Sequence, residues 1–272
     1  MRVLGLIAGS GPLPFEVADA AAELGMGVAI AAIERNADSA IESSARGPFD
    51  WFAAGELERV IGFLKDAGAG EVVLAGAVSK RELLQDPGSL RPDGRALALL
   101  GRLDARGDDA LLRAVAEELE SEGLRVVAST KYLGDRLVSE GVLAGAEPAP
   151  AVQADLVFGL TVAKSLGVQD VGQGVVVRAG TIVAVEAVEG TDAMIRRGAE
   201  LGGPGSVVVK VAKPGQDLRF DVPAIGPGTI ATAEEGGVAA IGLEAGRTIV
   251  LERARALAQA ERAGVSLVGL KG

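Results

Sequence analysis

Buried-strand patterns alternate with helical patterns along the first half of the chain. Residues 2–8 (RVLGLIA) form an aliphatic run that ends in a glycine turn, and apolar spacing over 15–24 predicts a helix closed by Gly25. The other predicted strands are 28–33, 51–53, 71–75 and 124–128, and the other predicted helices are 56–67, 96–103 and 109–121. This order predicts an α/β fold with a Rossmann-like parallel sheet over residues 1–134.

The second half has a different pattern. Gly and Pro residues over 135–150 predict a linker, and residues 174–178 and 181–187 flank Ala179-Gly180 as a β-hairpin. The remaining predicted helices are 152–166, 191–199, 229–235 and 252–263, and the remaining strands are 206–212, 238–243 and 265–268. We therefore predict a C-terminal mixed α/β domain over 151–272, whose topology the pattern leaves open.

Charge and hydropathy narrow the partners. The 272 residues carry a net charge of −10, and the sequence has no run of clustered Lys and Arg, which argues against nucleic acid. No uninterrupted apolar run approaches the roughly 18 residues of a membrane span, and the N-terminus is typical of a strand and turn rather than a signal peptide. We expect a cytoplasmic protein, and on general grounds a symmetric homodimer.

Two missing residue types narrow the chemistry. The chain has no Cys and no His, which excludes a thiolate nucleophile, a Ser-His-Asp triad, and sulfur or imidazole metal ligands. An enzyme of this composition must transfer protons through carboxylates, Lys or metal-bound water. Any metal is expected to be a hard, oxygen-bound cation such as Mg²⁺ or Mn²⁺.

Glycine turns after two of the predicted strands are candidate phosphate sites. The first turn contains Gly9, Ser10 and Gly11 and leads into a helix, where backbone N–H groups and the helix dipole favour an anion. Pro14 stands where the dinucleotide fingerprint needs its third glycine, so classical NAD binding is not favoured. The alternative is a tight turn without a ligand. The second turn, 76–80 with Ser79, is expected beside the first.

Other acidic residues of this half have two interpretations each. Glu34 ends the second strand, where it could bind a ribose. Asp108 and Asp109 begin a predicted helix, where they are either a cap and a first-turn acid or substrate contacts.

Three carboxylates cluster at a predicted strand-turn-helix corner. Glu186, Glu189 and Asp192 fall within seven positions and can converge on one hard cation. The alternative is that Asp192 is a helix cap, Glu189 a solvated turn residue and Glu186 an exposed strand position. The corner is a candidate metal site.

A polar loop over 213–226 supports the functional interpretation. Pro214 and Pro223 stiffen the loop, which carries both signs of charge through Lys213, Gln216, Arg219 and Asp221. Such a loop suits an anionic phosphate beside a metal ion or a base.

Five sequence blocks together resemble a known family. They are IAGSGPLP at 7–14, GDDALLR at 107–113, DVGQGVVV at 170–177, VAVEAVEGTDAMIRR at 183–197 and KPGQDLRFDVPAIGPGTI at 213–230. In this order and spacing they resemble the LpxI-type UDP-2,3-diacylglucosamine pyrophosphatases over almost the whole chain. Ala77 departs from the family's motif, which has Asn there.

The resemblance implies a lipid A biosynthetic hydrolase that cuts a lipid-linked UDP-sugar into 2,3-diacylglucosamine 1-phosphate (lipid X) and UMP. It implies Mg²⁺ as the cofactor, attack of water on the sugar-side phosphorus, and Asp221 as the catalytic aspartate. It also implies that the protein contacts the inner membrane only through its substrate. We hypothesise that Asp221, with Asp192 or Glu189, holds Mg²⁺ and orients the water, while Lys213 offsets phosphoryl charge.

The residues predicted for the site fall into three groups. Catalysis is assigned to Asp221, Lys213 and Asp192. Metal binding is assigned to Asp221, Glu189, Asp192 and Glu186. Substrate binding is assigned to Gly9, Ser10, Gly11, Ser79, Gln173, Thr191 and Gln216. The competing functions are a nucleotide-cofactor oxidoreductase, a nucleotide-sugar transferase, and a lipid or nucleotide carrier without activity.

Overall fold

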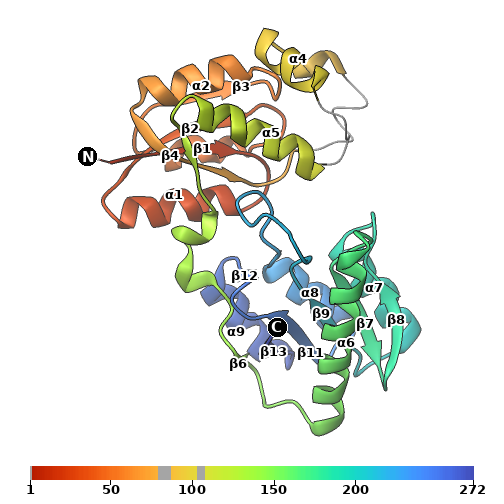
Figure 1. The fold of residues 1–272 in the computed structure, drawn as a ribbon. Coiled ribbons are helices and arrows are strands. Elements are labelled where there is room, and N and C mark those ends of the chain that lie inside the picture. The colour runs from red at the N-terminus through yellow and green to blue at the C-terminus, as the bar shows by residue number, and fades with distance from the viewer. Residues whose placement is uncertain (1, 79–86, 103–107) are drawn as a thin grey trace. The chain divides into compact units, whose positions relative to one another are not determined.

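The chain folds into two compact units, each with its own sheet. The structure, a computed structural model, describes residues 2–78, 87–102 and 108–272. The first unit comprises Met1–Gly134 with Asp217–Phe220, and the second comprises Asp135–Gln216 with Asp221–Gly272 (Figure 1). The predicted fold class, a Rossmann-like half followed by a mixed α/β half, is confirmed.

The first unit is built on a five-stranded parallel sheet with strand order β3-β2-β1-β4-β5. Its strands are β1 (Val3–Ala8), β2 (Gly27–Ile33), β3 (Phe49–Phe52), β4 (Ala69–Ala75) and β5 (Arg125–Val126). Its α-helices are α1 (Leu13–Glu23), α2 (Leu57–Asp66), α4 (Gly94–Gly101) and α5 (Asp108–Ser121). Short 3₁₀ turns occur at η1 (Ser39–Ser44), η2 (Pro87–Leu90), η3 (Ser129–Lys131) and, where the chain passes into the second unit, η4 (Gly134–Arg136).

Helices cover both faces of this sheet, with α1 on one face and α2 and α5 on the other (Figure 1). Every residue of β2 is buried, as expected of a parallel strand with helices on both sides. Gly5 of β1 has no side chain where a Cβ would lie 3.0 Å from Leu64 of α2 and 3.2 Å from Val72 of β4. Its small size lets the helix pack directly on the sheet.

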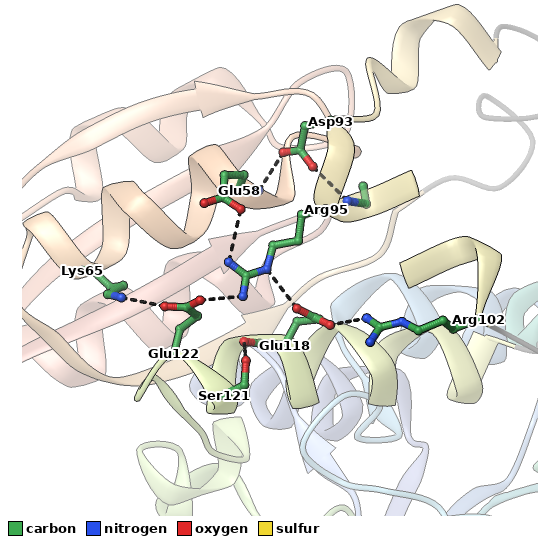
Figure 2. A network of polar contacts seen from close by, with 9 residues as sticks. Glu58, Lys65, Asp93, Arg95, Arg102, Glu118, Ser121 and Glu122 are labelled. Carbon is green, nitrogen blue, oxygen red and sulfur yellow. Dashed lines mark hydrogen bonds and ion pairs between the residues drawn. The ribbon is translucent and has the colours of Figure 1, made fainter. Parts of the chain in front are cut away.

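A network of charged side chains joins α2, α4 and α5 (Figure 2). Arg95 of α4 donates to Glu118 at 2.9 Å and to Glu122 at 2.6 Å, both on α5, and to Glu58 of α2 at 3.2 Å. Lys65 donates to Glu122 at 2.7 Å. Hydrogen bonds from Lys65 and Arg95 lower the pKa of Glu122 to about 2. Arg95 is the residue that all three helices share.

We expect Arg95→Gln to lower the free energy of unfolding by about 1–2 kcal/mol at pH 7, because it removes three charge-assisted bonds. The deficit should shrink as the pH falls from about 4.5, the ordinary range of a Glu carboxyl, toward 2, since the contribution of a carboxyl with a depressed pKa is lost over that interval. Denaturant unfolding at several pH values measures both. Arg102→Gln, which removes an exposed partner of Glu118, is the control, and an equal effect from both variants would contradict the prediction.

The second unit is built on a six-stranded mixed sheet with strand order β6-β13-β11-β9-β7-β8. Strands β9 (Val207–Lys210), β11 (Ala240–Glu244) and β13 (Ser266–Leu270) are parallel, while β6 (Gly141–Ala144), β7 (Gly174–Arg178) and β8 (Thr181–Val185) run antiparallel to their neighbours. A separate parallel pair joins β10 (Ala224–Ile225) and β12 (Ile249–Val250). The helices are α6 (Pro150–Val168), α7 (Thr191–Gly202), α8 (Pro227–Glu235) and α9 (Arg253–Ala263).

Side chains of β9 alternate between two cores. Val207 and Val209 pack in the cluster that contains Leu156 and Ala163 of α6. Val208 packs in the other cluster, with residues of α7, α8 and α9. Because side chains two apart in a strand share a face, Lys210 follows Val208 onto the side covered by α7 and α8.

Two features of the second unit differ from the sequence prediction. The hairpin at Ala179-Gly180 is confirmed, but the segment expected as a linker contains β6, which pairs with β13. Its four residues, GVLA, are too few to show the alternation of apolar and polar residues that predicts a strand. The two-residue strands β10 and β12 were missed for the same reason.

Helix α6 is the one described helix that is long and apolar enough to cross a membrane by length and composition. Core helices of soluble proteins meet the same criterion. Here Leu156, Gly159, Ala163 and Gly167 are buried against the sheet, although only 28% of the apolar window is buried. The criterion alone is therefore weak evidence of membrane insertion.

Candidate active site

Lys210 is the centre of the polar groups in the second unit. Its side chain is only 8% exposed, and its Nζ donates to Thr191 Oγ1 at 2.7 Å and to the carbonyl of Ala224 at 3.2 Å. Burial lowers the pKa of the Lys210 ammonium, and the charges of Glu186, Asp221 and Asp192 act in the opposite direction. An ammonium group thus lies among three of the carboxylates that the sequence singled out.

Glu186 reaches this centre across a glycine. Its backbone N–H donates to the carbonyl of Gly174 at 2.9 Å, and Gly174 pairs with Lys210 in the next strand. A Cβ on Gly174 would lie 2.7 Å from Glu186 Oε2, so the missing side chain makes room for the carboxylate. Glu186 Oε1 accepts from Thr191 Oγ1 at 2.6 Å, while its buried Oε2 has no partner among the described residues.

Two helices begin beside Lys210. Helix α7 starts at Thr191 after Gly190, whose φ is +83°, and α8 starts at Pro227 after Gly226. Among the described residues, no side chain caps the N-terminus of either helix. The N–H groups of the first turns therefore have no partner within their own helix and are able to bind an anion. Thr229 of α8 donates to Asp192 of α7 at 3.1 Å, linking the two starts.

A hollow of about 410 Å³ opens over these helix starts, with Arg196, Lys210 and Thr229 among its walls. Helix N-termini and cations together favour phosphate oxygens. The neighbouring carboxylates are negatively charged, so they can act as a base or as ligands for a hard cation. The arrangement can therefore bind a phosphoryl group and activate water beside it.

Asp221 and Gln216 meet at the polar loop. Gln216 Nε2 donates to Asp221 Oδ2, and Gln216 Oε1 accepts from the backbone N–H of Lys213 at 2.8 Å. Gln216 thus fixes the orientation of the Asp221 carboxylate. The neighbouring segment 217–220 belongs to the first unit, where Arg219 binds Asp217 at 2.8 Å and Glu120 at 3.1 Å.

The other predicted residues of the second unit have different surroundings. Glu189 binds Arg197 at 2.5 Å and accepts from the N–H of Ala187 at 3.0 Å, so an arginine meets the carboxylate that was predicted to bind metal. Lys213 binds Asp170 at 2.6 Å. Gln173 has a buried Oε1 without a hydrogen-bond partner among the described residues. Their roles remain predictions.

The two glycine turns of the first unit lie side by side, as predicted. The N–H groups of Gly9 and Ser10 donate to the carbonyls of Ala75 and Ala77, each at 2.8 Å. Both groups are therefore used within the protein and are removed from the predicted phosphate cradle, which leaves Gly11, with φ of +90°. Ser79 lies outside the described residues.

The carboxylates near Lys210 are the candidate ligands for the predicted cation. Among the described residues, no group of three or more Asp or Glu side chains is placed to hold a metal ion. Mg²⁺ in nucleotide enzymes is commonly held by one or two carboxylates together with substrate phosphates. Asp192, which lines the hollow, and Asp221, whose charge also acts on Lys210, are the candidates for that shared form of site.

Sequence reasoning missed Lys210, Arg196 and Thr229. The signal for Lys210 was present, since it is the one charged residue inside the apolar run SVVVKVA at 206–212. A Lys in a strand buried on both faces needs partners. Nothing comparable marks Arg196 or Thr229, whose position follows from how α7 and α8 pack.

Comparison with known proteins identifies the family. The LpxI N-terminal domain model matches residues 3–136 and the LpxI C-terminal domain model matches residues 139–268. The chain belongs to the LpxI family. One relative, from Caulobacter vibrioides and named UDP-2,3-diacylglucosamine pyrophosphatase LpxI, is 38% identical over 283 residues, which cover 99% of this chain and 98% of that relative. The acidic corner, Lys210 and Asp221 all lie in the part that matches the LpxI C-terminal domain.

Similarity to solved structures is low. A UDP-glucose 4-epimerase from Brucella ovis is 15% identical, with a TM-score of 0.29, over 43% of this chain and 33% of that one. An L-threonine dehydrogenase from Phytophthora infestans is 15% identical, with a TM-score of 0.29, over 46% and 34%. Likeness at this level supports no conclusion about an LpxI-family protein.

Proposed function

We propose that this chain hydrolyses the pyrophosphate of UDP-2,3-diacylglucosamine to 2,3-diacylglucosamine 1-phosphate and UMP. The observation that carries the proposal is the match to a pyrophosphatase of that name along almost the full length of both chains. The site in the second unit supports it, because a buried ammonium and two helix starts suit a phosphoryl group. The reaction is assigned to the cytoplasm, with membrane contact through the lipid substrate.

The positive groups of the site bind and polarise the pyrophosphate. The first-turn N–H groups of α7 and α8 donate hydrogen bonds to its oxygens, and Lys210 and Arg196 offset the charge that develops as the P–O bond breaks. Thr191, held between Lys210 and Glu186, fixes the ammonium in place. UMP leaves with the bridging oxygen.

The carboxylates serve the attacking water. Asp221, oriented by Gln216, accepts a proton from the water as its oxygen bonds to the sugar-side phosphorus. Asp192 and Asp221 are the residues that would hold Mg²⁺, which supplies Lewis acidity to phosphoryl oxygens when bound. The P–O–P bridge breaks, and the transferred oxygen remains on the lipid product.

Removal of metal should abolish the reaction. We expect the purified protein to release UMP from the substrate with Mg²⁺ present, to lose at least about 100-fold in rate after exhaustive chelation, and to recover when Mg²⁺ or Mn²⁺ is returned, because metal-assisted phosphoryl transfer depends on charge neutralisation. UMP quantified by chromatography is the readout. Undiminished release after chelation would remove the metal from the proposal, while no release under any condition would remove the function itself.

A homodimer is proposed on general grounds only. Light scattering of the purified chain measures its mass directly against the 27.4 kDa of one copy.

A further inference from the structure

A large hollow lies at the amino-terminal edge of the sheet in the first unit. Its volume is about 920 Å³, and it is formed where β1, β4 and β5 begin and where η3 ends. Ligands in open parallel sheets usually gather at the carboxyl ends of the strands, where Ser10 and Ala77 meet here. The hollow is therefore at the opposite edge from the glycine turns and has no part in the proposed hydrolysis.

Positive charge is in excess around this hollow. Of the described residues that line it, Arg2, Arg125 and Lys131 are cationic and Glu71 alone is acidic. Glu71 accepts from Arg125, from Lys131 and, at 2.7 Å, from the hydroxyl of Tyr132. A single carboxylate thus serves two cations and a phenol, in a chain whose net charge is −10.

The cations also act on one another. Burial lowers the pKa of the Lys131 ammonium, and the charges of Arg125 and Arg2 lower it further. Crowding of like charges disfavours the charged state of each. A bound anion would relieve this repulsion, and a guanidinium, with five N–H donors, can keep its bond to Glu71 while it binds one.

Helix capping is the simplest alternative explanation for these cations, because α1 and α2 both end at this edge. The last carbonyls of α1 already accept N–H bonds from residues 24–26, at 2.9–3.2 Å. The carbonyls of Phe63 and Lys65 in α2 likewise accept from Ala67 and Gly68, at 3.0 and 2.9 Å. Since the helix ends are capped by backbone, they do not account for the arginines.

The size and walls of the hollow indicate the kind of anion. A volume of about 920 Å³ is in the range of pockets for small organic ligands and exceeds what a phosphate group alone would fill. Val3, Leu24 and Met26 supply an apolar wall beside the cations. We propose that this hollow binds an organic phosphate, with Arg2, Arg125 and Lys131 on the phosphate and the apolar wall on the remainder of the molecule.

The single tyrosine of the chain makes the proposal testable. Tyr132 lines the hollow and is the only Tyr in the sequence, so tyrosine-selective isotope labelling of the full chain gives one ring signal. We expect inorganic pyrophosphate, as the minimal probe, to shift that signal saturably. Arg2→Gln and Arg125→Gln should each weaken the apparent affinity by about tenfold, as expected when a charge-assisted contact is lost.

Arg35→Gln is the matched control, because Arg35 follows the far end of β2 and the substitution removes the same charge. It should leave the affinity unchanged. The proposal would be overturned if the wild-type signal showed no saturable shift. It would also be overturned if all three folded variants weakened the affinity for pyrophosphate equally. Because a phospholipid headgroup carries the same chemistry, sedimentation with phosphatidylglycerol and phosphatidylcholine vesicles forms a second arm. If the protein binds the anionic vesicles and Arg125→Gln weakens that binding, the site is assigned to a lipid headgroup. If the protein binds pyrophosphate but not the anionic vesicles, the site is assigned to a free phosphate.

Discussion

Replacing Asp221 by Ala should lower kcat by about 10²–10⁴-fold, the usual contribution of a positioned general base, while the substrate still binds. The carboxylate acts on the charge of Lys210 and is oriented by Gln216. It is also exposed, so its loss leaves no buried cavity and little change in stability. Turnover by UMP release and substrate binding by calorimetry separate the two effects.

Two companion variants sharpen this prediction. Asp221→Asn keeps the size of the side chain and removes the charge, so it should be nearly as slow as Asp221→Ala. Asp135→Ala removes an exposed carboxylate that pairs with its neighbour Arg136, and its turnover should stay within about threefold of wild type. Near-normal turnover by a folded Asp221→Ala protein would contradict the assignment of Asp221 as a catalytic residue.

Replacing Lys210 by Met should lower kcat/KM by about 100-fold or more, because one preorganised cation is lost from the developing phosphoryl charge. The same change should destabilise the protein by about 3 kcal/mol, since it removes the cation whose charge acts on buried Glu186 and that is linked to it through Thr191. A second substitution, Glu186→Gln, removes that uncompensated charge. The double variant should recover stability and remain slow.

Lys164 provides a matched control for Lys210. Its Nζ binds Glu244, which is only 3% exposed, at 3.1 Å, so Lys164→Met also removes an ion pair from a buried carboxylate in the second unit, which keeps Arg247 at 3.9 Å. We expect it to lower the free energy of unfolding without changing kcat of the folded protein. If Lys210→Met regained full activity whenever its stability was restored, Lys210 would be structural only.

The first unit was largely predictable because its pattern is local. Parallel strands covered on both faces appear as continuous apolar runs, as in β2, and glycine turns separate them from helices with clear spacing. Pro14, which departs from the dinucleotide fingerprint, lies within the first turn of α1, where proline is tolerated.

The site of the second unit was predictable only in part. The acidic corner is contiguous in sequence, so Glu186 and Asp192 were found together. Their meeting with Lys210 depends on the register of three strands and on the missing side chain of Gly174, which are tertiary facts. The same limit explains why the pairing of Glu189 with Arg197, eight residues later in α7, was not predicted. It also explains why the cations at residues 2, 125 and 131, far apart in the chain, were not predicted to meet.

Turnover in ¹⁸O-labelled water tests the central claim most directly, that this chain cleaves the pyrophosphate by attack of water on the sugar-side phosphorus. The account predicts many equivalents of UMP and of 2,3-diacylglucosamine 1-phosphate per chain, in equal amounts, with one ¹⁸O in the lipid phosphate and none in UMP by mass spectrometry. Recovery of intact substrate bound to the protein, or ¹⁸O in UMP, would contradict it.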